Sequence, residues 1–198
     1  SINKKRGVWN FSGNVAPNFV DHILKSVPFY QKGHEIIINS SDYFLKNGSI
    51  CYDLGCSTSE LLISLSKFSN KKIKLIGLDD EFKMVQFSKK LIKKNKIKNI
   101  EIKKADIIKH KFKKSDLIIS YYTMQFIEPK FRQIYLNKIY KSLNWGGALF
   151  LFEKIRGNDA RFQDILTNLY HDFKEKNGFT IKDIDRKAKS LRGVLEPF

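Results

Sequence analysis

The stretch that decides the fold is YDLGCSTSE, residues 52–60, in which an apolar run with an embedded acid breaks into small residues. Asp53 belongs to the run, Gly55 opens the break, and Ser57 and Ser59 can cap a following helix. A glycine lets the backbone approach a ligand without obstruction by a Cβ. The stretch therefore predicts the first strand of an α/β sheet and its turn into a helix, where such sheets bind nucleotides. GCSTSE is not a full G-x-G-x-x-G motif, so a plain strand-to-helix turn explains the same residues.

On either side of this stretch, short apolar runs alternate with stretches of helical spacing. The runs are rich in Ile, Leu, Phe and Tyr, and several end in an acid or glycine, which is typical of strands. One helix is predicted after Pro129, a residue suited to a first helical turn, and NWGG (144–147) is predicted to end it at a glycine C-cap. The alternation predicts a mostly parallel sheet with helices on both faces. The predicted strands are 49–55, 72–80, 100–106, 115–122 and 146–154.

Three of the predicted strands carry an acid at or near their carboxyl ends. Asp79 follows Gly55 by about two dozen residues, close to the ~20 expected of an acid that accepts hydrogen bonds from ribose hydroxyls. Asp53 and Asp106 occupy comparable positions in the first and third strands. Because the carboxyl ends of parallel strands meet at one edge, we expect three carboxylates along the rim of a nucleotide site. Ordinary strand-end or capping acids are the alternative.

Length and composition favour one domain. The chain has 198 residues, of which 42% are hydrophobic, enough for one sizeable core. No apolar run approaches the roughly 18 residues of a spanning helix, and SINKKRGVWNF lacks an apolar signal region, so we expect a cytoplasmic protein without a membrane partner. Cys51 and Cys56 are predicted to be reduced, packed thiols. The histidines show no metal-ligand spacing, so no metal site is expected.

The net charge of +17 raises the question of a polyanionic partner. Basic residues concentrate between positions 89 and 114, and clustered cations neutralise phosphates. Most of these residues are lysines, whereas arginine is favoured for bidentate contacts with phosphates and bases. We favour a solvated lysine surface, with direct nucleic-acid binding as the alternative.

The order of the motifs resembles the class I S-adenosylmethionine-dependent methyltransferases. DLGCS, GLDD, KAD, YYTMQFIEP and LNWGGALFLFEK follow one another as in that family. The resemblance is closer still to the carboxy-S-adenosylmethionine synthase group, which makes a carboxymethyl donor for tRNA wobble uridine from S-adenosylmethionine and prephenate. The motifs that carry this closer resemblance are VWNF (8–11), SVPFY (26–30), QFIEP (125–129) and HDFKEKNGF (171–179).

The resemblance implies one S-adenosylmethionine-binding domain with a Rossmann-like methyltransferase fold over residues 1–198. It divides into an N-terminal helical lid (1–47), a core sheet (48–155) and a helical C-terminal segment (156–198). Sheets of this type normally finish with an antiparallel hairpin, but only helical-looking sequence follows GGALFLFEK. We therefore expect the chain to be incomplete at its C-terminal end, or a partner such as a second copy in a homodimer to cover the edge strand.

The same resemblance assigns residues to a cofactor, S-adenosylmethionine or its carboxylated form. Asp79, with Asp80 beside it, would hold the ribose hydroxyls, and Tyr30 would close over the donor from the lid. A carboxylate suits the ribose and an aromatic ring suits a sulfonium cation. Along the methionine part would lie Gly55, Cys56 and Ser57, with Asp53 behind them, and at the adenine edge Asp106 and Ile107.

Two positions depart from the synthase pattern. Where the relatives have an arginine for the extra carboxylate this chain has Ala188, although Lys187, Lys189 or Arg192 can compensate. Where they have an asparagine at the end of the fourth strand it has Tyr121. Tyr121 and its neighbour Tyr122 are candidate catalytic acid/base residues, with simple packing as the alternative.

These departures lead us to expect methyl transfer from S-adenosylmethionine to a small-molecule acceptor first. The second reading is carboxy-S-adenosylmethionine synthesis in the service of tRNA modification. A non-catalytic cofactor-binding or RNA-binding subunit on the same fold is the third, favoured by the basic surface.

Overall fold

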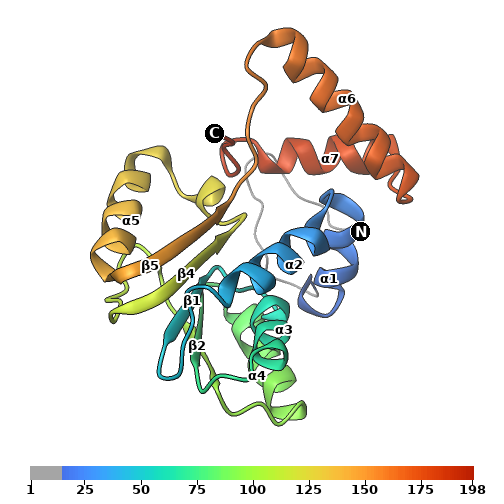
Figure 1. Cartoon of the computed structure of the whole chain (residues 1–198). Helices are drawn as coiled ribbons and strands as arrows, with labels where there is room; N and C mark the ends of the chain where they lie inside the picture. Colours follow the sequence, from blue (N-terminus) through green and yellow to red (C-terminus); the bar gives the residue numbers. More distant parts are fainter. Residues whose placement is uncertain (1–14) are drawn as a thin grey trace.

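The computed structural model describes residues 15–198, so the VWNF motif at 8–11 lies outside the described residues. Five strands form one sheet in the order β3-β2-β1-β4-β5, and every neighbouring pair is parallel (Figure 1). This arrangement confirms the predicted α/β class and places each strand on a predicted apolar run. The strands are β1 (Ile50–Leu54), β2 (Lys74–Asp79), β3 (Ile100–Lys104), β4 (Ser115–Tyr121) and β5 (Leu143–Phe152).

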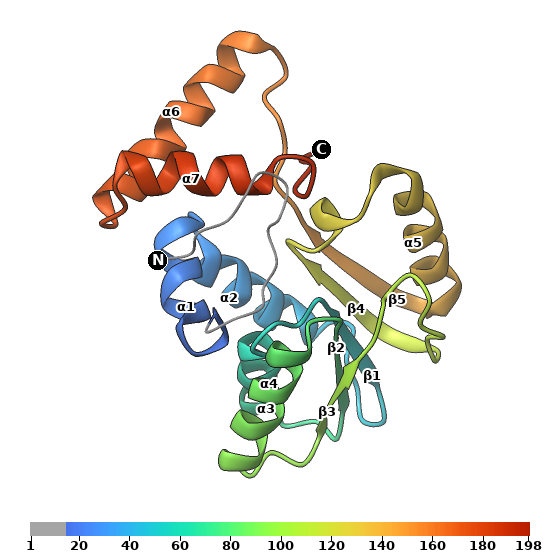
Figure 2. The same cartoon turned by 180° about the vertical axis from the view of Figure 1, so that it is seen from behind.

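Helices cover both faces of the sheet, as the alternation of elements predicts (Figures 1 and 2). On one face, Ile37, Leu62 and Val85 from three different helices pack with strand residues into a single buried cluster. On the other face, Tyr135 and Ile139 belong to a second cluster under a single helix. The helices on the first face are α2 (Tyr30–Ser41), α3 (Glu60–Phe68) and α4 (Phe82–Lys94), and the helix on the second is α5 (Pro129–Ser142).

The prediction that NWGG ends the helix after Pro129 is wrong. Helix α5 ends at Ser142, and Leu143 already has an extended backbone with φ −69° and ψ 138°. Leu143 pairs with β4, so NWGG lies inside β5 at a place where the pairing shifts register. Gly146 has a φ of 77°, in the left-handed region that favours glycine. The two glycines therefore serve a bulge in the strand and do not form a helix cap.

A helical layer lies beyond the carboxyl ends of the strands. Its first helix packs on α4 through Ala16, Phe19 and Met84. In both views the last two helices lie next to the first two, although more than 100 residues separate them in the sequence (Figures 1 and 2). The chain's last residue returns to the end of β5, where the N–H of Phe198 donates to the carbonyl of Lys154 over 3.1 Å. The layer comprises α1 (Val15–Ser26), α2, α6 (Ala160–Lys176) and α7 (Ile181–Leu191).

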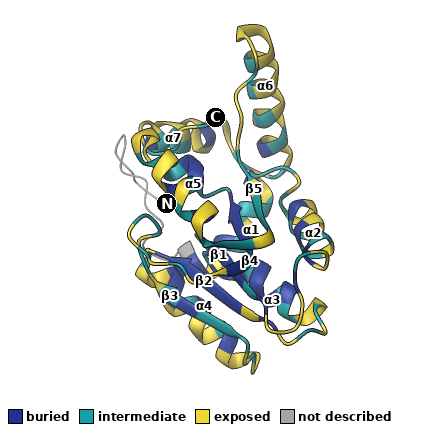
Figure 3. Ribbon diagram, turned by 60° about the vertical axis from the view of Figure 1, so that its left-hand side comes forward, coloured by how far each residue is buried: buried dark blue, intermediate teal, exposed yellow. Residues whose placement is uncertain are grey.

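Helix α6 and strand β5 both carry exposed surface that no other described element covers. Helix α6 projects from the body of the molecule with most of its length exposed (Figure 3). Strand β5 is an edge of the sheet, and the side chain of Trp145 on it is fully exposed. Within residues 15–198, none of the helices combines the length and apolarity needed to cross a membrane.

Candidate functional site

A cavity of about 1660 Å³ lies between the carboxyl ends of the strands and the helical layer. Ala188 of α7, where the resemblance leads us to expect an arginine, is part of its wall. The structure brings all the residues predicted as cofactor-binding or catalytic into the same wall, although they come from the lid, four strand ends and the loops that follow. They are Tyr30, Asp53, Gly55, Cys56, Ser57, Asp79, Asp80, Asp106, Ile107, Tyr121 and Tyr122.

The turn after β1 requires a glycine at position 55. Gly55 has a φ of 76°, and a Cβ there would lie 2.5 Å from the hydroxyl oxygen of Thr123. That hydroxyl donates to the carbonyl of Leu54 over 2.7 Å, which fixes the threonine in place. Ser59 stands at the N-cap position of α3, but its side chain makes no capping hydrogen bond, contrary to the prediction for this residue. The turn is therefore shaped by close backbone packing and not by serine capping.

Asp79 holds two loops together at the end of β2. Its carboxylate accepts hydrogen bonds from the backbone N–H of Ser57 over 2.8 Å and of Glu81 over 2.9 Å. Burial nevertheless raises its pKa to about 6, because the loss of water outweighs the two hydrogen bonds. Asp53 is 3% exposed, and burial together with the charge of Asp79 raises its pKa to about 7. Among residues 15–198 neither acid forms an ion pair, so this side of the cavity favours a cation.

Asp106 lies two residues beyond the end of β3 and begins a tight turn. One carboxylate oxygen accepts from the N–H of Ile108 over 2.8 Å, and the other lies 3.6 Å from the ammonium of Lys109. The turn is tied to β2 by the N–H of Ala105, which donates to the carbonyl of Asp79. Asp106 thus joins Asp53 and Asp79 on one rim of the cavity, as the strand-end acids predict.

An aromatic cluster of Tyr30, His34, Tyr121, Tyr122 and Phe152 joins the lid to the sheet. The ring centroids of Tyr30 and Tyr121 are 5.1 Å apart, and those of Tyr121 and Tyr122 are 4.7 Å apart. Burial lowers the pKa of His34 to about 4, so its imidazole is neutral at pH 7. Tyr30, Tyr121 and Tyr122 line the same cavity as the acids, and electron-rich rings suit a sulfonium cation.

Helix α2 approaches the sheet at Gly33, where any Cβ would overlap the phenol of Tyr121. The hydroxyl of Tyr121 donates to the carbonyl of Tyr30 over 2.6 Å. Burial raises the pKa of Tyr121, which opposes proton transfer at neutral pH. These contacts favour the packing role over acid/base work for Tyr121. Tyr122 is half-buried in the left-handed region, with a φ of 55°.

Several polar residues of the cavity wall were not singled out for a role from the sequence, among them Glu153, Lys154, Lys174 and His22. Glu153 accepts from the N–H of Met124 over 2.7 Å and from that of Gln125 over 3.1 Å, and burial raises its pKa to about 7. Lys154 just after β5, Lys174 on α6 and His22 on α1 line the same cavity. The only available signal was that Glu153 and Lys154 end the LNWGGALFLFEK motif and that Lys174 belongs to the HDFKEKNGF motif.

The three cationic residues near Ala188 that can compensate for the arginine differ in their contacts. The ammonium of Lys189 lies 2.6 Å from the carboxylate of Asp185, and both side chains are more than half exposed. Arg192 lines the cavity, and so does Lys187, whose ammonium lies 2.6 Å from Nε2 of His22. Lys187 and Arg192 therefore remain the candidates to compensate for the missing arginine, whereas Lys189 is engaged elsewhere.

Comparison with known proteins points to one family. A model described as a methyltransferase domain matches residues 45–192. The chain is 36% identical over 190 residues to a carboxy-S-adenosyl-L-methionine synthase of Sulfurimonas denitrificans, covering 96% of this chain and 80% of the relative. It is 38% identical over 191 residues to the enzyme of that name from Campylobacter jejuni, again covering 96% of this chain and 80% of the relative.

A solved structure shares the fold. A putative S-adenosyl-L-methionine-dependent methyltransferase of Methanococcus maripaludis superposes with a TM-score of 0.60 at 23% identity, covering 98% of this chain and 87% of the other. The Rossmann-like sheet and the relatives together identify an enzyme that uses S-adenosylmethionine as its cofactor. The chain belongs to the class I S-adenosylmethionine-dependent methyltransferases, within the carboxy-S-adenosyl-L-methionine synthase family.

Proposed function

We propose that this enzyme makes carboxy-S-adenosylmethionine from S-adenosylmethionine and prephenate, a product that serves tRNA wobble uridine modification. The observation that carries the proposal is the 34–38% identity to synthases of that name over 96% of the chain. This conclusion reverses the order of the two leading expectations from the sequence. Simple methyl transfer becomes the second candidate.

The acidic side of the cavity supports the cofactor half of this proposal. S-adenosylmethionine supplies an activated methyl group on a sulfonium. Asp53 and Asp79 are buried carboxylates without ion pairs among the described residues. Burial raises their pKa values, and a cationic ligand would lower these pKa values again by stabilising the charged carboxylates. Asp79 would also hold the ribose, Gly55 would admit the methionine part, and Tyr30 would shield the sulfonium from water.

Methyl transfer to a small acceptor stays as the second candidate because of Ala188. A methyl side chain cannot supply the forked pair that an arginine offers a carboxylate. Retention of a carboxylated donor would then depend on Arg192 or Lys187, which line the same cavity.

The test is mass spectrometry of the cofactor after incubation of the enzyme with S-adenosylmethionine, with and without prephenate. The expected product is the cofactor with one carbon dioxide added, formed only when prephenate is present. A control incubation replaces prephenate by phenylpyruvate, which has no carboxyl group to give from the ring. If S-adenosylmethionine binds but no carboxylated product forms, methyl transfer takes the place of synthesis.

A further inference from the structure

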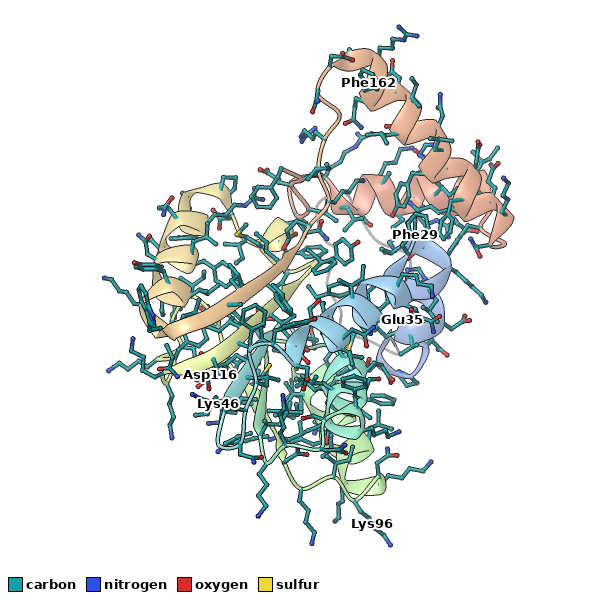
Figure 4. The ribbon with its side chains drawn as sticks, in the orientation of Figure 1. Phe29, Glu35, Lys46, Lys96, Asp116 and Phe162 are labelled. Carbon is teal, nitrogen blue, oxygen red and sulfur yellow. The ribbon has the colours of Figure 1, made fainter. Side chains whose placement is uncertain are left out.

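The side of the cavity formed by the helical layer carries a lysine cluster, which we define as Lys154, Lys174 and Lys187 with His22 and Tyr170. The ammonium groups of Lys174 and Lys154 lie 3.7 and 4.8 Å from the centroid of the Tyr170 ring. The ammonium of Lys187 lies 2.6 Å from Nε2 of His22. These side chains come from α1, α6, α7 and the residues after β5, and all five line the cavity. In Figure 4 the label of Phe29, the residue before α2, lies just below α7.

The cluster places positive charge around one buried lysine, Lys174, with Lys187 half-buried and Lys154 exposed beside it. Lys174 is only 8% exposed, and burial with the charges of Lys187 and Lys154 lowers its pKa to about 7. Burial lowers the pKa of Lys187 to about 8 and, with Lys187 and Lys174, that of His22 to about 4. Within residues 15–198, no carboxylate lies in ion-pair distance of Lys154 or Lys174. The buried charge of Lys174, with other cations near it, is unfavourable unless an anion compensates it.

The cluster adjoins the expected position of the cofactor's sulfonium. Burial raises the pKa of Tyr170 to about 12, and the nearby phenol of Tyr122 contributes to this shift. The ring of Tyr122 in turn stacks on Tyr30, with centroids 6.3 Å apart. The cavity thus has an acidic side at Asp53 and Asp79 and a basic side at the lysines, with the aromatic cluster between them. A cationic cofactor and an anionic second substrate fit these two sides respectively.

We infer that Lys154, Lys174 and Lys187 bind the carboxylate groups of a small dianionic second substrate beside the cofactor, with the ring of Tyr170 against its apolar part. The inference rests on the proposed function, because the carboxyl donor of that reaction is such a dianion. The competing explanation is that the lysines are structural and are satisfied by the Tyr170 ring alone. The two explanations predict opposite effects of removing a charge from the cluster.

The experiment measures thermal unfolding and calorimetric binding of malonate to the full chain without cofactor, at constant ionic strength. Acetate and the neutral malonamide are the control ligands. The variants are Lys174→Met and Lys154→Met, and the matched control is Lys189→Met, which removes an exposed lysine already paired with Asp185. Malonate is expected to raise the melting temperature of the wild type and the Lys189→Met protein.

In the Lys174→Met protein, we expect malonate affinity to fall at least about tenfold, the scale of a lost charge-assisted hydrogen bond. Its melting temperature without ligand should equal or exceed that of the wild type, because a buried like charge is gone. The inference is overturned if malonate stabilises the wild type no more than acetate does. It is equally overturned if Lys174→Met lowers the melting temperature but leaves malonate binding intact. Lys154→Met decides the matter by the same criteria if Lys174→Met does not fold.

The outcome is distinguishable from failure of the proposed function. If malonate binds through Lys174 but the enzyme forms no carboxylated cofactor from prephenate, the anion site is supported and the synthase proposal is refuted. If Lys174→Met and Lys154→Met both form the carboxylated product with an unchanged KM for prephenate, the synthase proposal is supported and the anion site is refuted.

Discussion

Replacement of Asp79 by alanine should affect both stability and cofactor binding. The carboxylate accepts two backbone N–H groups, those of Ser57 and Glu81, and is 8% exposed. The sequence alone suggests that Asp79→Ala leaves the fold intact, because it assigns the residue only to the ribose. The structure changes this expectation, since alanine leaves both donors without their acceptor at the turn that forms the site.

The magnitude follows from two opposing contributions. Each buried donor left unsatisfied costs about 1–3 kcal/mol, so the two together cost about 2–6 kcal/mol. Against this, the raised pKa of Asp79, about 6 compared with 3.8, means that its charged form is disfavoured in the folded state by about 3 kcal/mol. The stability that the protonated carboxyl contributes is complete below about pH 4 and is lost as pH rises through 6. The variant should therefore lose most relative to wild type near pH 4 and about 3 kcal/mol less near pH 7.5.

The assay is urea unfolding at these two pH values, together with calorimetric titration with S-adenosylmethionine at pH 7.5. Asp80→Ala is the matched control, because Asp80 is the exposed acid next along the same loop and its removal should change stability by under about 0.5 kcal/mol. We expect the Asp79 variant to bind the cofactor a few kcal/mol more weakly, on the scale of charged hydrogen bonds to the ribose. Equal urea midpoints for the variant and wild type at both pH values would refute the reasoning on the turn. Equal cofactor affinity would refute the placement of the ribose.

Three further experiments test other parts of the site. Binding of S-adenosylmethionine at pH 6.5 should release protons, because a nearby cation lowers the pKa of Asp53 from about 7. Calorimetric titrations in two buffers of different ionisation enthalpy measure the number of protons released. If no protons are released, the cofactor's cation does not lie near Asp53. Tyr121→Phe removes the hydrogen bond to Tyr30 and should reduce the free energy of unfolding by about 1 kcal/mol in urea, whereas a smaller loss than in Tyr122→Phe would contradict the lid contact. Ala188→Arg should raise affinity for the carboxylated cofactor more than for the plain one in calorimetry. Equal gains would mean that position 188 does not reach the donor.

Local patterns predicted the sheet because its strands are apolar runs long enough to need burial on both faces. Gly55 and Asp79 were found in the same way, since a turn and a strand end leave a mark within a few residues. The two glycines of NWGG misled the prediction, because a left-handed backbone suits a helix end and a strand bulge equally.

No local sequence pattern predicted the lysine cluster. Its members stand at positions 22, 154, 170, 174 and 187, on elements that meet only in the folded molecule. Each lysine by itself is one of many in a basic chain, and its burial decides its chemistry. The same is true of the contact between Tyr121 and the backbone of Tyr30, which joins residues 91 apart in the sequence.

The close approach of α2 to the sheet at Gly33 makes the residue allowed at position 33 depend on the side chain at position 121. A glycine inside a helix costs about 1 kcal/mol relative to alanine, so it persists only where space demands it. Here the phenol of Tyr121 occupies that space. An asparagine at the position of Tyr121 would have a shorter side chain and would leave room for alanine or serine at the position of Gly33. Covariation of this pair across the family would therefore trace which lineages anchor the lid through a tyrosine and which hold it by other means.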